Sequence, residues 1–139
     1  AYDVALCLDV IEHLPFADQE KAIGEIRRIL RKGGIALISL PNLAHIACRV
    51  YFLLTGKLIR PSAVERHRGE RPIAEYIELF KKHGFVVVKR KGMFPTLPLI
   101  SIATYFFPEK ALPLHRIENR LFGYPNWCLL NILVLSKER

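Results

Sequence analysis

The chain has 139 residues, of which 51% are apolar and 24% are charged, and its formal net charge at pH 7 is +8. This length and composition are typical of one globular domain and argue against a disordered or low-complexity protein. No apolar run approaches the roughly 20 residues of a membrane-spanning helix, so the sequence predicts no transmembrane segment. Three widely spaced cysteines without a CxxC pair indicate reduced thiols, which predicts a cytoplasmic protein.

The positive charge is concentrated in the middle of the chain. Residues 49–91 carry a net charge of +7, whereas residues 1–48 carry −1 and residues 92–139 carry +2. Such a basic segment can contact nucleic acid, anionic lipid or an acidic substrate, or can serve only as a solvated surface. The basic residues are not interleaved with aromatic ones, as stacking on nucleic-acid bases would require. The sequence therefore argues against nucleic acid as the partner.

Hydrophobic patterns predict alternating strands and helices. Continuous apolar runs predict buried strands over residues 3–8, 35–40, 85–89 and 129–136. Apolar residues at helical spacing predict three helices, which lie between Asp18 and Gly33, between Asn42 and Gly56, and between Pro72 and Gly84. The predicted core face of the last helix consists of Ile73, Tyr76, Ile77 and Phe80. Asp18 and Asn42 are good N-caps, and each helix ends at a glycine. This alternation predicts an α/β fold with a mostly parallel sheet, whose last strand is antiparallel.

The predicted sheet indicates that residues 1–139 are the second half of a larger domain, because four strands are few for such a sheet and the first of them is uncovered. The first predicted strand would form an apolar sheet edge with no helix ahead of it to cover one face, which natural proteins avoid. The connection over residues 92–126 holds five of the nine prolines and is too long for a hairpin, so we interpret it as an apolar, Pro-rich lid or binding insertion. The exposed first strand also favours an edge-paired or domain-swapped homodimer.

Four segments carry a resemblance to one enzyme family. Residues 2–14, YDVALCLDVIEHL, resemble the fourth strand of class I S-adenosylmethionine-dependent methyltransferases, in the small-molecule subgroup that includes ubiquinone-biosynthesis enzymes. Residues 25–34, 35–42 and 81–85 resemble the family's "R.L..GG" helix end, its fifth strand ending in PN, and the start of its sixth strand. The resemblance implies the carboxyl-terminal half of a partial Rossmann-like methyltransferase sheet with helices on both faces, and S-adenosylmethionine as cofactor.

The predicted site lies at the carboxyl ends of the first two strands, where open parallel sheets bind their ligands. The resemblance implies that the residues after the first strand flank the methionine part of the cofactor and face the substrate; these are Asp9, Val10, Ile11 and Leu14. Pro41 and Asn42 follow the second strand and would border the same crevice, facing the substrate. Asp9 has an alternative role, in which it bonds backbone N–H groups at the strand end.

Methyl transfer from a sulfonium needs mainly alignment and a dry site. A hydroxyl or phenol acceptor also needs a base with a pKa near ambient pH. His13 is the first candidate for this catalytic base and Glu12 is the second. Alternatively, Glu12 caps a turn or pairs with an arginine, and His13 holds the loop by a hydrogen bond.

The family's cofactor-binding signals are absent from this sequence. In the family's complete fold, a glycine-rich loop follows the first strand and an acidic residue follows the second. Neither has a counterpart in the 139 residues. The isolated chain is therefore expected to be inactive, and methyl transfer to a small-molecule or lipid-like acceptor is expected of a larger domain. The alternative is a non-catalytic methyltransferase-like scaffold that acts in protein or membrane-surface interactions.

The insertion contains an uncharged apolar and aromatic stretch over residues 94–107. It could cover a substrate pocket, with Phe106 and Phe107 against a greasy acceptor, or pack only on its own core. It could also dip into a membrane surface beside the basic loop, whose arginines are Arg60, Arg66, Arg68 and Arg71. His45 and Cys48 have helical spacing, but no second pair has ligand spacing, so the sequence predicts no metal site.

Overall fold

The structure is a computed structural model, and it describes residues 1–58, 68–97, 100 and 104–138. Its strands are β1 (Tyr2–Leu8), β2 (Leu30–Pro41), β3 (Phe85–Pro95) and β4 (Cys128–Lys137). Its α-helices are α1 (Phe16–Ile29), α2 (Ile46–Thr55), α3 (Ile73–Lys82) and α5 (Ala111–Phe122). Two short 3₁₀ helices, η1 (Ile11–His13) and η2 (Pro108–Lys110), precede α1 and α5. The order of elements confirms the predicted α/β class.

The four strands form one mixed sheet in the order β1-β2-β4-β3. β1 and β2 are parallel, whereas β4 is antiparallel to both of its neighbours, β2 and β3. The first three strands therefore point the same way and the last strand is antiparallel, as predicted. Only the pairing of β1 with β2 is parallel, however, so the prediction of a mostly parallel sheet is met only in part. Because β4 lies between β2 and β3, the two outer strands are β1 and β3.

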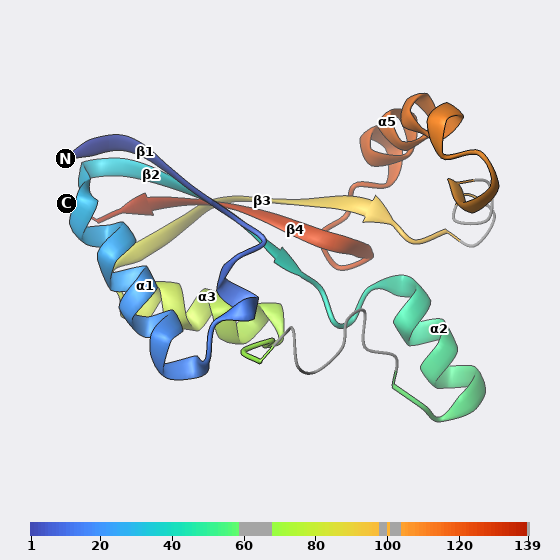
Figure 1. Ribbon diagram of the computed structural model, residues 1–139, viewed down its shortest axis with the longest axis horizontal. Helices are drawn as coiled ribbons and strands as arrows, with labels where there is room; N and C mark the ends of the chain where they lie inside the picture. The colour runs from blue at the N-terminus through green and yellow to red at the C-terminus, as the bar shows by residue number, and fades with distance from the viewer. Residues whose placement is uncertain (59–67, 98–99, 101–103, 139) are drawn as a thin grey trace.

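The hydrophobic core lies between the sheet and the helices α1 and α3, which cover one face (Figure 1). The predicted inner face of α3 is confirmed, because Ile73, Tyr76 and Phe80 are buried there. Leu133 and Leu135 of β4 meet them from the sheet. A fully buried side chain of this size contributes about 1.5–3 kcal/mol. Packing in this layer therefore holds the sheet to the two helices.

The other face of the sheet is open along β1. Val4, Leu6 and Leu8 point away from the core and are 51%, 65% and 52% exposed. They alternate with Ala5 and Cys7, which pack against the core, as the period of two residues in a strand requires. Figure 1 shows α5 on this second side, over the far end of β3. Helices therefore lie on both faces, but β1 has none on its open face.

The first helix and the strand after it differ from the prediction at both ends. Asp18 does not cap α1, because the helix begins at Phe16 and the Asp18 N–H donates to the Pro15 carbonyl (2.9 Å). The helix also ends at Ile29, so the interpretation of Gly33 as its stop is wrong. Gly33 instead has a φ of 70° in β2, where the pairing with β1 is interrupted. Only glycine adopts this conformation readily, and it permits the bulge.

The predicted insertion over residues 92–126 is largely regular structure. β3 continues to Pro95 by pairing with β4, and α5 occupies residues 111–122. Pro113 is the third residue of α5, where a backbone N–H would have no partner within the helix. The prolines therefore do not break the helix, although they suggested an irregular segment. Within the described ranges, no helix is both long and apolar enough to cross a membrane.

Candidate functional site

The ends of β1 and β2 are joined by one pair of side chains. The Asp9 N–H donates to Ser39 Oγ (2.8 Å), and the Ser39 hydroxyl donates to Asp9 Oδ1 (2.7 Å). Asp9 has a φ of 52°, a left-handed conformation that aspartate tolerates better than most residues. The Asp9 carboxylate thus bonds a neighbouring side chain, and the turn directs the chain from the sheet into η1.

The residues of η1 and its flanks point in different directions. Ile11 and Glu12 are buried, whereas Val10 and His13 are exposed and Leu14 is half-buried. Burial, followed by the charge of Glu12, raises the pKa of the Cys7 thiol, which places Glu12 near the inner side of β1. Of the two predicted bases, His13 is therefore the one at the surface.

A buried glutamine that the sequence analysis did not single out holds η1 in place. Gln19 of α1 reaches the carbonyl oxygens of Ile11, Leu14 and Gly69 through its Nε2, at 3.0, 3.1 and 2.6 Å. Its Oε1 accepts a hydrogen bond from Arg71 Nε (2.9 Å). The signal in the sequence is a polar residue four positions before Ile23, on the core-facing stripe of the helix.

Tyr76 completes this network and makes it sensitive to alkaline pH. Its hydroxyl is buried and donates to the Gly69 carbonyl (2.9 Å), and burial raises its pKa from 10.0 to about 12. The folded state therefore holds this proton more tightly than the unfolded chain. The resulting stability is fully present below pH 10 and is lost as the pH rises to about 12.

Tyr76→Phe should remove this pH dependence along with one hydrogen bond worth about 1 kcal/mol. We expect the free energy of unfolding of the wild type to fall more steeply than that of the variant between about pH 9 and pH 11. Urea unfolding at both pH values measures the two slopes. The exposed Tyr105→Phe is the control and should follow the wild type. Equal slopes for wild type and Tyr76→Phe would contradict the assignment.

Pro41, at the end of β2, and Asn42 are buried, although they were expected to border a crevice and face the substrate. Asn42 is buried, and its Nδ2 donates to the carbonyls of Cys128 (2.9 Å) and Pro125 (3.3 Å), while its Oδ1 accepts from the Ala44 N–H (3.1 Å). It heads a turn instead of capping α2, which begins at Ile46. Pro41 is also buried. The structure brings Ser39 to Asp9, whereas it turns Asn42 toward β4.

His45 and Cys48 form a hydrogen-bonded pair at the start of α2. His45 Nε2 lies 3.0 Å from Cys48 Sγ, and its Nδ1 lies 2.8 Å from Thr96 Oγ1. Burial lowers the pKa of His45 and, with the charge of Glu70 second, raises that of Cys48. Both groups are thus held neutral. Among the residues that the structure describes, no three His, Cys, Asp or Glu side chains gather where they could hold a metal ion.

Phe106 and Phe107 lie far from the carboxyl ends of β1 and β2. Both are exposed and line a small cavity of about 280 Å³ beside η2. Figure 1 shows this segment at the end of the molecule that carries α5, well apart from the turn after β1. The structure therefore does not bring the two phenylalanines to Asp9 and His13. Of the arginines predicted in the basic loop, Arg60 and Arg66 lie outside the described residues.

The fold is similar to those of several solved methyltransferase structures. The chain is similar to a Thermotoga maritima methyltransferase described as a possible histamine N-methyltransferase, with a TM-score of 0.56 and 20% identity over 98% of this chain and 56% of that one. It is also similar to the cyclopropane synthase MmaA2 from Mycobacterium tuberculosis, with a TM-score of 0.56 and 19% identity over 97% and 55% of the two chains.

A third solved structure, phosphoethanolamine N-methyltransferase 2 from Haemonchus contortus, was determined with S-adenosylhomocysteine bound. It has a TM-score of 0.55 and 18% identity over 99% of this chain and 34% of that one. The chain thus spans between about a third and just over half of these proteins. No curated protein matches the chain significantly. The family model described as a methyltransferase domain matches residues 1–90. The chain therefore belongs to the methyltransferase domain family.

Proposed function

We propose that this chain is the carboxyl-terminal half of an S-adenosylmethionine-dependent methyltransferase of the small-molecule, ubiquinone-biosynthesis-like subgroup. The complete protein transfers a methyl group to a small-molecule or lipid-like acceptor. The observation that carries the proposal is the junction of Asp9 and Ser39 at the carboxyl ends of two parallel strands. In open α/β sheets, ligands bind in this position.

The open face of the sheet supports the view that more polypeptide completes the domain. Val4, Leu6 and Leu8 expose more than half of their surface on one face of an edge strand. Exposed apolar edge strands are sites of association. A further segment of polypeptide, from the same chain or from a partner, would cover this face and would supply the glycine-rich loop that the 139 residues lack. A second copy, paired through β1, is the alternative occupant.

The residues after β1 fit one part of the cofactor. The Asp9 carboxylate can accept hydrogen bonds from an ammonium group, and Val10 offers exposed apolar surface beside it. Bound S-adenosylmethionine supplies an electrophilic methyl group on a sulfonium. Ile11 is fully buried and supports the turn from below. In this arrangement Asp9 and Val10 contact the cofactor, while Ile11 and Leu14 hold the backbone that presents them.

His13 is the base of the proposed reaction. It is exposed on η1, four residues after Asp9, and an imidazole nitrogen can accept a proton from a reacting hydroxyl. His13 would take the proton that a hydroxyl acceptor releases as its oxygen is methylated. Glu12 lies on the inner side near Cys7 and Tyr76, whose pKa values are raised mainly by burial and further by the charge of Glu12. Glu12 is therefore a positioning residue in this proposal.

Calorimetric titration with S-adenosylmethionine tests the proposal on the 139-residue chain and on a chain extended by the sequence encoded ahead of Ala1. We expect the extended chain to bind and the shorter chain not to bind. In the extended chain, Asp9→Asn should weaken binding about tenfold, because it removes a charged hydrogen bond. Asparagine also tolerates the left-handed φ, so the turn should persist. Asp18→Asn, on the surface of α1, is the matched control.

The other outcomes are equally informative. Binding by neither chain would favour the alternative, a methyltransferase-like scaffold without catalysis. Binding by the 139-residue chain with full affinity would contradict the view that part of the cofactor site lies outside it. Equal affinities for Asp9→Asn and Asp18→Asn would remove Asp9 from the site.

A further inference from the structure

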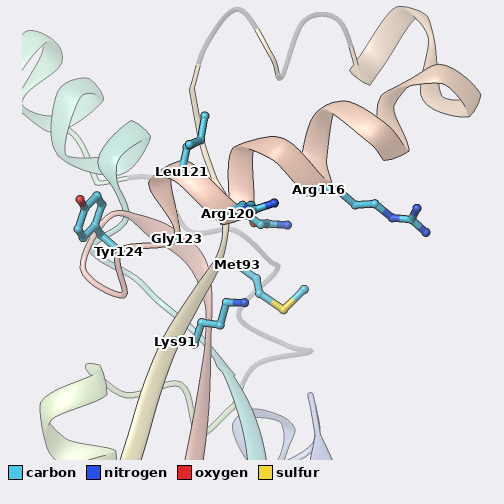
Figure 2. A pocket seen from close by; sticks show the side chains of 8 residues that line it. Lys91, Met93, Arg116, Arg120, Leu121, Gly123 and Tyr124 are labelled. Carbon is cyan, nitrogen blue, oxygen red and sulfur yellow. The ribbon is translucent and has the colours of Figure 1, made fainter.

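A cavity of about 590 Å³ lies between β3 and α5, apart from the turn that follows β1. Figure 2 shows Lys91 and Met93 of β3 on one side of it and Arg116 and Arg120 of α5 on the other. Lys91 pairs with Ile132 of β4 in the same register row as the open-face residues. The cavity therefore opens on the face of the sheet opposite α1 and α3.

Three cations line this cavity, and its lining contains no acidic residue; they are Lys91, Arg116 and Arg120. Six other Lys and Arg residues of the described chain form ion pairs, for example Lys21 with Asp18 and Arg28 with Glu25. Among the residues that the structure describes, no carboxylate pairs with any of the three cavity cations. The nearest acidic residue in sequence, Glu118, turns inward to His115 Nδ1 (3.0 Å).

The two arginines are exposed and are spaced so that both can reach one bound anion. Arg116 and Arg120 are four residues apart on α5, so they lie on the same face of the helix. Like charges at this spacing repel each other. Lys91 adds a third positive charge from the neighbouring strand. An anion between them would turn mutual repulsion into attraction, and guanidinium groups match phosphate oxygens in geometry.

The backbone around the cavity is held in a defined position. Asn119 Oδ1 accepts a hydrogen bond from the Phe94 N–H (2.7 Å), which joins α5 to the end of β3. The Gly92 N–H donates to the Gly123 carbonyl (3.2 Å). A Cβ on Gly92 would lie 2.6 Å from Cys128 Sγ, so only glycine permits this approach. The cations are thus carried on two elements whose separation is fixed by packing.

Apolar groups also line the cavity. Met93 lies between Lys91 and the two arginines in Figure 2, whereas the side chains of Leu121 and Tyr124 point away from it. A ligand that fills the cavity would meet the apolar Met93 side chain among the three cations. Pockets of this size and mixed lining are typical of small-molecule sites.

We propose that this cavity binds a phosphate monoester that carries an apolar group. The phosphate lies among Lys91, Arg116 and Arg120, and the apolar group packs against Met93. β1 and β3 are opposite edges of the sheet, three strand spacings or roughly 14 Å apart. The site is therefore distinct from the turn at Asp9, and it stands whether or not the chain takes part in methyl transfer.

Titration calorimetry with hexyl phosphate tests this site. We expect the wild-type protein to bind with a Kd of about 1 mM or tighter, as a ligand of this size allows. Arg116→Gln combined with Arg120→Gln should weaken binding at least about tenfold, because each substitution removes a charged hydrogen bond to the phosphate. Glutamine is a good helix former, so α5 should persist. Lys32→Gln combined with Lys57→Gln removes the same charge elsewhere and should bind like the wild type.

Three further probes separate the sources of the signal. Hexanol, which lacks the phosphate, should bind at least about tenfold more weakly than hexyl phosphate. Inorganic phosphate should bind more weakly as well, because it lacks the apolar contact. Hexyl phosphate that binds both double variants equally would overturn the site. Binding only to vesicles that contain phosphatidic acid, with no affinity for hexyl phosphate, would overturn it in favour of a membrane surface.

Discussion

Replacing Gln19 by leucine is expected to lower the free energy of unfolding by about 3 kcal/mol, although the two side chains are similar in volume. Gln19 is fully buried, and its amide bonds three carbonyls and one arginine. The Ile11 and Gly69 carbonyls would keep second donors, the Leu14 N–H (3.1 Å) and the Tyr76 hydroxyl (2.9 Å). The half-buried Leu14 carbonyl and the partly buried Arg71 Nε would lose these bonds, and an unsatisfied polar group away from water costs about 1–3 kcal/mol.

Equilibrium urea unfolding measures this loss. Lys21→Ala on the exposed side of the same helix is the control, and it should change the free energy of unfolding by less than about 0.5 kcal/mol. A loss below about 1 kcal/mol for Gln19→Leu would mean that water replaces the amide and that the network does not hold η1. The predicted loss would instead show that the turn with Asp9 and His13 depends on α1.

Gly69→Ala is expected to destabilise the protein by about 3 kcal/mol, at the upper end of the range for overpacking. A Cβ at this position would overlap the Leu14 carbonyl oxygen and Gln19 Nε2. The Leu14 oxygen belongs to the backbone and cannot move without displacing the turn after η1. The Gly69 N–H also donates to the Glu12 carbonyl (3.1 Å), so the displacement would spread into η1.

Gly24→Ala is the matched control, and its effect should have the opposite sign. Gly24 lies inside α1, and beyond its chain neighbours and the backbone of its own helix no heavy atom stands within 4 Å of the position that its Cβ would occupy. Alanine should therefore stabilise the helix by about 0.5–1 kcal/mol, because it loses less backbone entropy than glycine on folding. Urea unfolding of both variants gives the two signs. A Gly69→Ala protein as stable as the wild type would contradict the close approach of residue 69 to Leu14.

Patterns within short segments of the sequence were sufficient to predict the secondary-structure elements and the family. The apolar runs predicted four strands, and the spacing of Ile73, Tyr76 and Phe80 predicted the buried face of α3. Gly56 and Gly84 were predicted as helix stops, and both have the left-handed φ that such a position favours. The methyltransferase family also follows from short motifs within residues 1–90. These features depend on periods of two or 3.6 residues and on conformational limits of single residues.

Long-range contacts settled the remaining features, because nothing in a short segment specifies them. Two of the partners of Gln19, Gly69 and Arg71, lie fifty or more residues later in the chain and meet it only through the tertiary fold. Prolines suggested an irregular segment where α5 forms, since only the observed helix start places Pro113 at a tolerated position. The cationic cavity unites Lys91 with Arg116 and Arg120 through the pairing of β3 with β4 and the docking of α5. Chain pattern thus specifies the elements, and the packing between them brings distant charges and hydrogen-bonding groups together.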